Sequence, residues 1–118
     1  MSIKSSNAML SPRTYSGHTR HVTALLGKRV KHARKLRRMT EAELAERVGV
    51  SRSTVRAIEQ GSLKVEIGLF LEAAVICGVT LFTDNPTELA AHLQRIDDRL
   101  CLLPDRVRSE RQDFNEDF

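Results

Sequence analysis

The chain has 118 residues and a net charge of +4, with 41% hydrophobic and 29% charged residues. This size and composition are typical of one compact globular domain with irregular ends. No apolar run approaches the roughly 20 residues that span a membrane, and residues 1–20 lack the apolar stretch of a secretory signal. The composition therefore predicts a cytoplasmic protein without a membrane partner.

Charge is distributed unevenly along the chain. Residues 28–64 contain eleven Lys and Arg against four Asp and Glu, a net charge of +7, whereas residues 66–118 have a net charge of −6. A strongly basic segment on a small folded unit favours a polyanionic partner. The alternative is a solvated basic helix face, and charge alone leaves both open. Aromatic residues make up only 4% of the chain, which favours an all-α fold.

The N-terminal part predicts an unstructured lead-in to a first helix. Residues 1–21 are rich in Ser, Thr and Asn, which predicts a disordered arm or an expression remnant. From Val22 the apolar positions recur every three or four residues, which predicts a helix with a basic outer face. The stripe predicted to face inward consists of Leu25, Leu26, Arg29, Val30, Ala33 and Leu36.

The next two helices are short and closely spaced. Thr40 and Glu43 form the pattern of a capping box, which begins the second helix, and Gly49 suits its end. Ser51 then caps a third helix, which stops at Gly61. The positions of both helices predicted to face inward are apolar: Leu44, Ala45, Val48, Val55 and Ile58.

Two further helices are predicted after Gly61. A fourth spans Glu66 to Cys77, and Asn85-Pro86-Thr87-Glu88 forms a second capping box that begins a fifth helix, ending near Leu100. The residues of the fourth helix predicted to face inward are Ile67, Phe70, Leu71, Ala74 and Val75. The predicted segments are a DNA-binding domain over 22–82, a C-terminal helix over 83–103 and a flexible acidic tail over 104–118.

Two short helices joined by a tight turn in a basic helical bundle predict a helix-turn-helix. Packing of the second helix on the third leaves the start of the third helix facing outward. Such a helix reads base edges in the major groove with its N-terminal residues, here Arg52, Ser53, Arg56 and Ala57. The hydroxyls of Ser51 and Thr54 are suited to phosphate contacts. The alternative for the two arginines is a pair of solvated side chains on a surface helix.

The stretch ELAERVGVS, followed by Ile58-Glu59 and Gly61, resembles the Cro/CI (XRE-type) helix-turn-helix family. The resemblance covers about half the chain and implies a lambda-repressor-like bundle of five helices with flexible tails. It also implies an internal ion pair between Arg34 and Glu59.

The same resemblance implies the positions of DNA contacts. Base contacts fall on Arg52, Ser53, Arg56 and Ala57, and phosphate contacts fall on the start of the second helix, on Thr54 and around Lys64. One position departs from the pattern, because Glu41 stands where the family often has Gln. An acid repels phosphate, so that contact does not carry over: either Glu41 serves only the helix dipole, or DNA lies slightly differently on this protein.

The fifth helix carries apolar residues at the spacing of a helix–helix seam: Leu89, Leu93, Ile96 and Leu100. We interpret this stripe as a surface for a homodimer or another partner, and the alternative is packing on its own domain. A two-fold dimer predicts a palindromic operator with half-site centres about 34 Å apart.

The C-terminal part, which includes the sequence LLPDRVR, is similar to the tails of HipB-like antitoxins. That resemblance implies an autorepressor that also binds a HipA-like kinase toxin. A free-standing phage-like repressor and an interaction protein that mainly neutralises a toxin remain alternatives, and repression is not distinguished from activation.

No enzyme chemistry is visible in the sequence. It contains no Gly-rich phosphate loop and no grouped catalytic residues, and its four histidines have no metal-ligand spacing, so we expect no cofactor and no metal. Cys77 and Cys101 both have apolar neighbours, which favours two buried free thiols over a disulfide.

Overall fold

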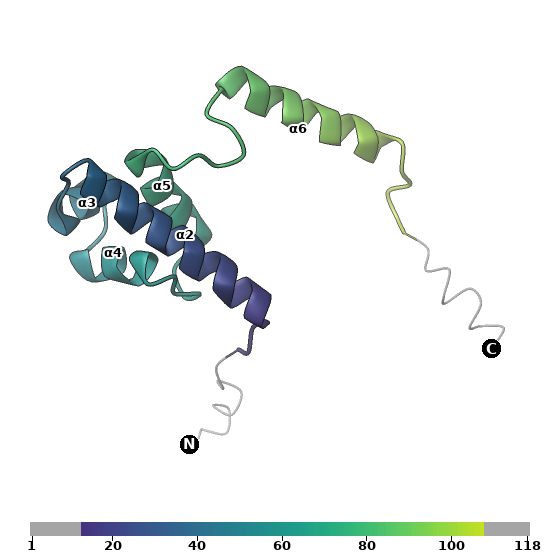
Figure 1. Cartoon of the computed structure of the whole chain (residues 1–118). Helices are drawn as coiled ribbons and strands as arrows, with labels where there is room; N and C mark the ends of the chain where they lie inside the picture. The colour runs from purple at the N-terminus through teal and green to yellow at the C-terminus, as the bar shows by residue number, and fades with distance from the viewer. Residues whose placement is uncertain (1–12, 108–118) are drawn as a thin grey trace. The chain divides into compact units, whose positions relative to one another are not determined.

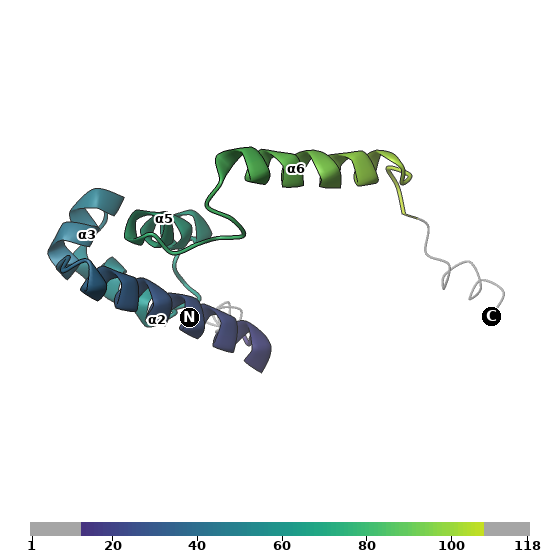
Figure 2. The ribbon, with the colours of Figure 1, turned by 45° about the horizontal axis from the view of Figure 1, so that its top comes forward.

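The computed structural model describes residues 13–107, and this part of the chain is all-α, without a strand. Its helices divide between two units, one that ends at Leu81 and one that begins at Phe82. The first unit contains α2, α3, α4 and α5, in which α2 and α3 each pack against both α4 and α5 (Figures 1 and 2). The helices are α2 (Gly17–Leu36), α3 (Glu41–Val48), α4 (Arg52–Glu59), α5 (Ile67–Cys77) and α6 (Pro86–Cys101).

Helix α2 begins at Gly17, five residues before the Val22 start predicted from the apolar stripe. The prediction that residues 17–21 belong to a disordered arm is therefore wrong. The first turn forms because the Ser16 hydroxyl accepts a hydrogen bond from the Thr19 amide at 3.1 Å. Ser16 is polar and precedes the apolar stripe of α2, so the spacing of apolar residues could not reveal this cap. In the rest of the predicted arm, residues 13–16 are non-helical, and residues 1–12 lie outside the described residues.

Helices α3 and α4 begin at the predicted caps. The Thr40 hydroxyl accepts from the Glu43 amide at 3.0 Å, and the Glu43 carboxylate accepts from the Thr40 amide at 2.8 Å, which completes the capping box. The Ser51 hydroxyl accepts from the Thr54 amide at 3.1 Å and begins α4. The turn between the two helices is therefore only the segment 49–51.

The core lies between α2, α3, α4 and α5. Its residues are Val30, Met39, Leu44, Ala45, Val55, Ile58, Phe70, Ala73, Ala74 and Cys77. Several residues predicted to face inward are instead exposed: Leu25, Arg29 and Leu36 of α2, and Ile67, Leu71 and Val75 of α5. Helix α5 is apolar almost all round, so its periodicity did not identify which side faces the core. In α2 the buried strip is narrower than predicted.

Close approach of α2 to the end of α4 requires two glycines. A Cβ on Gly27 would lie 2.5 Å from the carbonyl oxygen of Ile58, and a Cβ on Gly61 would lie 2.7 Å from the Cα of Ala24. Gly61 also has a φ of 74°, which other residues rarely adopt. The backbone of α2 therefore lies directly against the C-terminal end of α4 and the turn that follows it.

The two thiols are in different environments. Cys77 is buried in the core, but Cys101 is exposed at the end of α6, and both are free. The prediction of two buried thiols is therefore wrong for Cys101. Its neighbours Leu100 and Leu102 are apolar in sequence but exposed in the structure.

Helix α6 is capped by Asn85, whose side-chain oxygen accepts from the amides of Thr87 at 2.9 Å and Glu88 at 3.3 Å. The predicted reciprocal bond from Glu88 is replaced, because the Asn85 amide donates to the Thr83 hydroxyl at 3.1 Å. The second capping box is therefore only half present. No residue of α6 is buried. Of the predicted acidic tail, residues 104–107 are non-helical and exposed, and residues 108–118 lie outside the described part.

Candidate nucleic-acid interface

The candidate interface is the exposed side of α4. Leu44 and Ala45 of α3 and Val55 and Ile58 of α4 are buried, so the opposite side of α4 faces outward. Arg52, Ser53 and Arg56 are exposed there, and Ala57 is half-buried between them and the core. The structure therefore brings the four predicted base-contacting residues to one side of a single eight-residue helix.

A buried ion pair fixes α4 against α2. Arg34 Nε donates to Glu59 Oε2 at 2.6 Å, and Arg34 Nη2 donates to Glu59 Oε1 at 3.2 Å, while the two side chains are only 8% and 4% exposed. Arg34 Nη1 also donates to the carbonyl oxygen of Met39 at 2.9 Å. The hydrogen bond to Glu59 raises the pKa of Arg34 above its usual value. This bidentate pair is the one implied by the family resemblance. Through Arg34 it connects α2 with α4 and with the segment before α3.

Glu41, the first residue of α3, lies beside the arginines of α4. Its Oε1 accepts from Arg56 Nε at 3.1 Å and lies 3.9 Å from Arg52 Nη2. The hydrogen bond from Arg56 lowers the pKa of Glu41, so the carboxylate is charged at neutral pH. Sequence reasoning assigned Glu41 only to the helix dipole or to a shifted DNA position, and it missed these contacts. Arg52 and Arg56 lie 11 and 15 positions after Glu41, and no sequence spacing predicts that they meet it.

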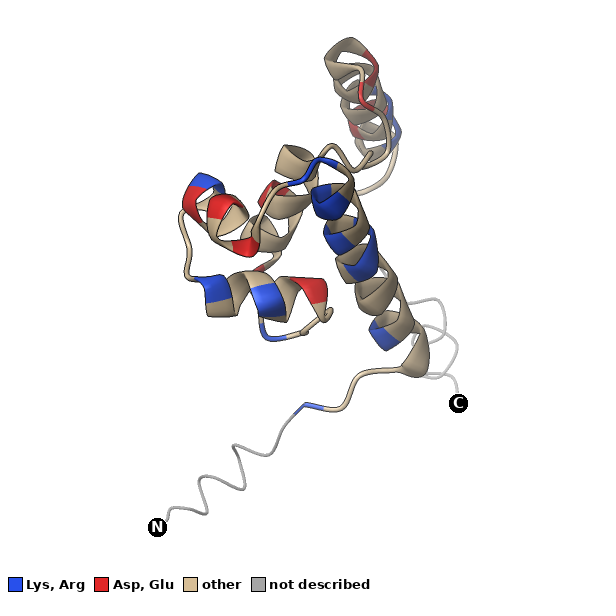
Figure 3. Ribbon diagram, turned by 60° about the vertical axis from the view of Figure 1, so that its left-hand side comes forward, with Lys and Arg blue, Asp and Glu red and all other residues tan. Residues whose placement is uncertain are grey.

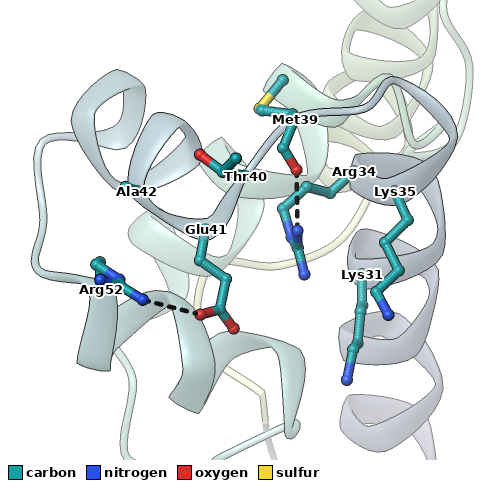
Figure 4. A pocket seen from close by; sticks show the side chains of 8 residues that line it. All are labelled: Lys31, Arg34, Lys35, Met39, Thr40, Glu41, Ala42 and Arg52. Carbon is teal, nitrogen blue, oxygen red and sulfur yellow. Dashed lines mark hydrogen bonds and ion pairs between the residues drawn. The ribbon is translucent and has the colours of Figure 1, made fainter.

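Basic side chains of α2 extend this surface on one side of α4. Lys31 and Lys35 line an open pocket of about 650 Å³ together with Glu41 and Arg52 (Figure 4). Basic segments run along α2 as well as α4 (Figure 3). Glu41 is the one carboxylate among the residues that line this pocket.

Lys64 extends the surface on the other side of α4. It is exposed in the segment after α4 and lines an open pocket of about 340 Å³ with Ser53, Thr54 and Ala57. The hydroxyls of Ser51 and Thr54 lie 3.1 Å apart and share one hydrogen bond, which leaves one hydroxyl hydrogen of the pair for an external acceptor. The predicted phosphate contacts therefore flank the predicted base contacts.

Comparison with family models matches residues 25–83, half of the chain, to a helix-turn-helix domain. The chain belongs to the helix-turn-helix domain family. No curated protein sequence and no solved structure matches it. The family indicates a DNA-binding regulator, and its members are typically not enzymes.

The helix-turn-helix match includes α3, α4 and α5 but ends before α6. The predicted seam of α6 therefore lies outside the matched domain. Leu89, Leu93, Ile96 and Leu100 are 40%, 60%, 47% and 58% exposed.

The described part of this helix-turn-helix protein contains no cluster of His, Cys, Asp and Glu that could hold a metal ion. None of its described helices is long and apolar enough to cross a membrane. The candidate interface offers hydrogen-bond donors and positive charges together with the carboxylate of Glu41.

Proposed function

We propose that the protein is a sequence-specific transcriptional regulator, a repressor of the Cro/CI (XRE) type that acts in the cytoplasm. The exposure of Arg52, Ser53 and Arg56 together on the outer side of α4 carries this proposal. An arginine can donate two hydrogen bonds to the O6 and N7 of guanine, and serine can bond to several base edges. Ser51, Thr54 and Lys64 then position the helix on phosphates.

The test is selection of random duplexes by the purified protein at near-physiological salt. We expect an enriched palindrome. Arg52→Ala should weaken operator binding by about 1–3 kcal/mol and relax the preference for one base pair in each half-site. Lys64→Ala should weaken binding to all sequences alike. Lys28→Ala serves as a control, because Lys28 is an exposed α2 residue that lies in none of these pockets. If Arg52→Ala lowered the affinity for operator and random DNA equally, Arg52 would not contact a base.

We also propose that the protein binds as a homodimer through the exposed stripe of α6. Two copies related by a two-fold axis present two α4 helices, which matches a palindromic operator. Leu93→Glu with Ile96→Glu should convert the dimer to a monomer in analytical ultracentrifugation and abolish cooperative operator binding. Leu36→Glu places a charge on an exposed leucine of α2 and should leave the dimer intact. A wild-type monomer at micromolar concentration would refute the dimer.

A second candidate function is that of a HipB-like antitoxin, which neutralises a HipA-like kinase toxin. It rests on the resemblance of the C-terminal sequence, and it is supported by the exposure of Leu102, Leu103 and Val107 after α6, at 84%, 61% and 85%. Co-purification from the native operon should then recover a kinase-like protein. A chain truncated after Cys101 should lose that protein but retain operator binding, and retention of the kinase would place its binding site elsewhere.

A further inference from the structure

A second basic pocket lies beside the start of α2. Its volume is about 450 Å³, and it is lined by Arg13, Tyr15 and Arg20 on one side and by Ser62, Leu63 and Lys64 on the other. Three of these side chains are positively charged, and no residue that lines the pocket is acidic. The sequence predictions assigned Arg13 and Arg20 to a disordered arm without a role.

Tyr15 organises both arginines of this pocket. Its carbonyl oxygen accepts from Arg20 Nη1 at 2.6 Å, and the guanidinium carbon of Arg13 lies 5.6 Å from the centre of its ring. The first contact leaves the other nitrogens of Arg20 available as donors, and the second holds Arg13 over the ring by a cation–π interaction. Contacts with Tyr15 therefore restrain both guanidinium groups in the lining of one pocket.

The opposite wall of the pocket is fixed to α2 through the backbone. Gly61 lies so close to Ala24 that no side chain fits between them. The next residue, Ser62, donates its amide to the carbonyl oxygen of Ala57 at 2.9 Å, and its hydroxyl accepts from the Lys64 amide at 3.2 Å. Lys64 is thereby held at the end of α4, facing the start of α2.

The pocket is continuous with the candidate interface. Lys64 lines both this pocket and the pocket that contains Ser53, Thr54 and Ala57. In addition, the first turn of α2 contains no acidic residue, and its helix dipole favours an anion. A DNA strand that passes from α4 along Lys64 would next meet Arg20 and Arg13.

We propose that this pocket binds a backbone phosphate of the DNA that flanks each half-site, with Arg13, Arg20 and Lys64 as its ligands. The inference rests on the proposed function, because its phosphate belongs to the DNA that α4 contacts. The two arginines offer N–H groups in the planar geometry that suits phosphate oxygens. Because phosphate contacts carry no direct sequence information, the pocket adds affinity and fixes register without altering base preference.

The experiment measures DNA affinity against salt concentration for the full-length wild type, Arg13→Ala, Arg20→Ala and Lys28→Ala. Lys28→Ala removes one positive charge from the exposed side of α2 outside the pocket. Each phosphate contact contributes a slope of about −0.9 to the dependence of log K on log salt. We expect Arg20→Ala to lower the magnitude of the slope by about that amount, equally on operator and random DNA, whereas Lys28→Ala leaves it nearly unchanged.

Duplex length provides the second measurement. The difference between wild type and Arg20→Ala should disappear on an operator trimmed of its flanking base pairs, because the phosphate is then absent. Circular dichroism of Arg20→Ala checks that α2 remains folded, and Arg13→Ala, outside α2, provides the same measurement if it does not.

Four outcomes would overturn the inference. An unchanged slope for both arginine variants, or a loss matched by Lys28→Ala, refutes the pocket while Arg52-dependent operator binding still supports the proposed function. A difference that persists on the trimmed operator places the contact elsewhere. If wild type binds no DNA, both the proposed function and the inference fail.

Discussion

The carboxylate of Glu41 accepts a hydrogen bond from Arg56 Nε at 3.1 Å, on the outer side of the helix-turn-helix. The same oxygen lies 3.9 Å from Arg52 Nη2. One negative charge at the start of α3 is therefore shared by both arginines proposed to contact bases. This arrangement restrains their side chains before DNA is bound and partly neutralises them towards phosphate.

Glu41→Gln should increase affinity for random DNA and decrease discrimination between operator and random DNA. The substitution removes the charge that opposes phosphate binding, and it frees Arg56 from a fixed orientation. Affinity selection and salt titration measure both effects, with a steeper salt dependence than wild type. Glu46→Gln is the matched control, because it removes the same charge from an exposed position of α3 that forms no ion pair with any described residue. If the two variants behaved identically, the effect of Glu41 would come from net charge alone and not from its contacts with Arg52 and Arg56.

Breaking the ion pair of Arg34 and Glu59 should strongly destabilise the domain. Arg34→Met leaves the Glu59 carboxylate buried without its partner, and we expect the free energy of unfolding to fall by about 3 kcal/mol or more. The double variant Arg34→Met with Glu59→Leu should lose less, because neither charge remains buried. Urea unfolding with the double-mutant cycle measures the difference. Losses that simply add would show that the two residues do not interact.

Gly27→Ala should destabilise the protein even though alanine favours helices. Its Cβ would lie 2.5 Å from the Ile58 carbonyl oxygen and would push α2 away from α4. Gly68→Ala is the control within α5, since its Cβ would meet only a Glu66 side-chain oxygen at 3.6 Å. It should be neutral or stabilise by up to about 1 kcal/mol. Thermal unfolding compares the two, and similar melting temperatures would contradict the close contact.

The two thiols should differ in reactivity. At neutral pH an alkylating reagent should modify exposed Cys101 first, while buried Cys77 reacts only as the domain unfolds. Mass spectrometry of the labelled peptides gives the order, and equal rates at the two positions would contradict the burial of Cys77.

Burial raises the pKa of the Cys77 thiol above its ordinary 9.0. The neutral thiol is therefore favoured in the folded state, so its contribution to stability is constant below pH 9 and falls as the pH rises above it. Cys77→Ala should remove this alkaline loss of stability, and Cys101→Ala should retain it. Urea unfolding over the alkaline range measures both.

Much of the fold could be predicted from local chemistry. The caps at Thr40 and Ser51 and the buried positions Leu44, Val55 and Ile58 follow from short-range patterns, and the structure confirms them. These signals suffice to predict two short helices with one outer side. The exposure of the residues proposed to contact bases follows from the same reasoning.

Contacts between segments distant in sequence could not be predicted in this way. The pairing of Glu41 with Arg56 depends on the angle at which α3 meets α4, and the pocket around Tyr15 depends on the approach permitted by Gly61. Helix α5 shows the same limit, because nearly every position is apolar and only packing decides that Phe70 is buried while Val75 is exposed.

Helix α4 separates two tasks on its two sides. Val55, Ile58 and Glu59 are buried and hold the bundle together, whereas Arg52, Ser53 and Arg56 are exposed on the outer side. Selection can therefore alter the outer residues freely without unfolding the protein. Related regulators built on this frame can diverge in their target genes by a few substitutions, and a library randomised at the outer positions would remain largely folded and could be screened directly for new operators.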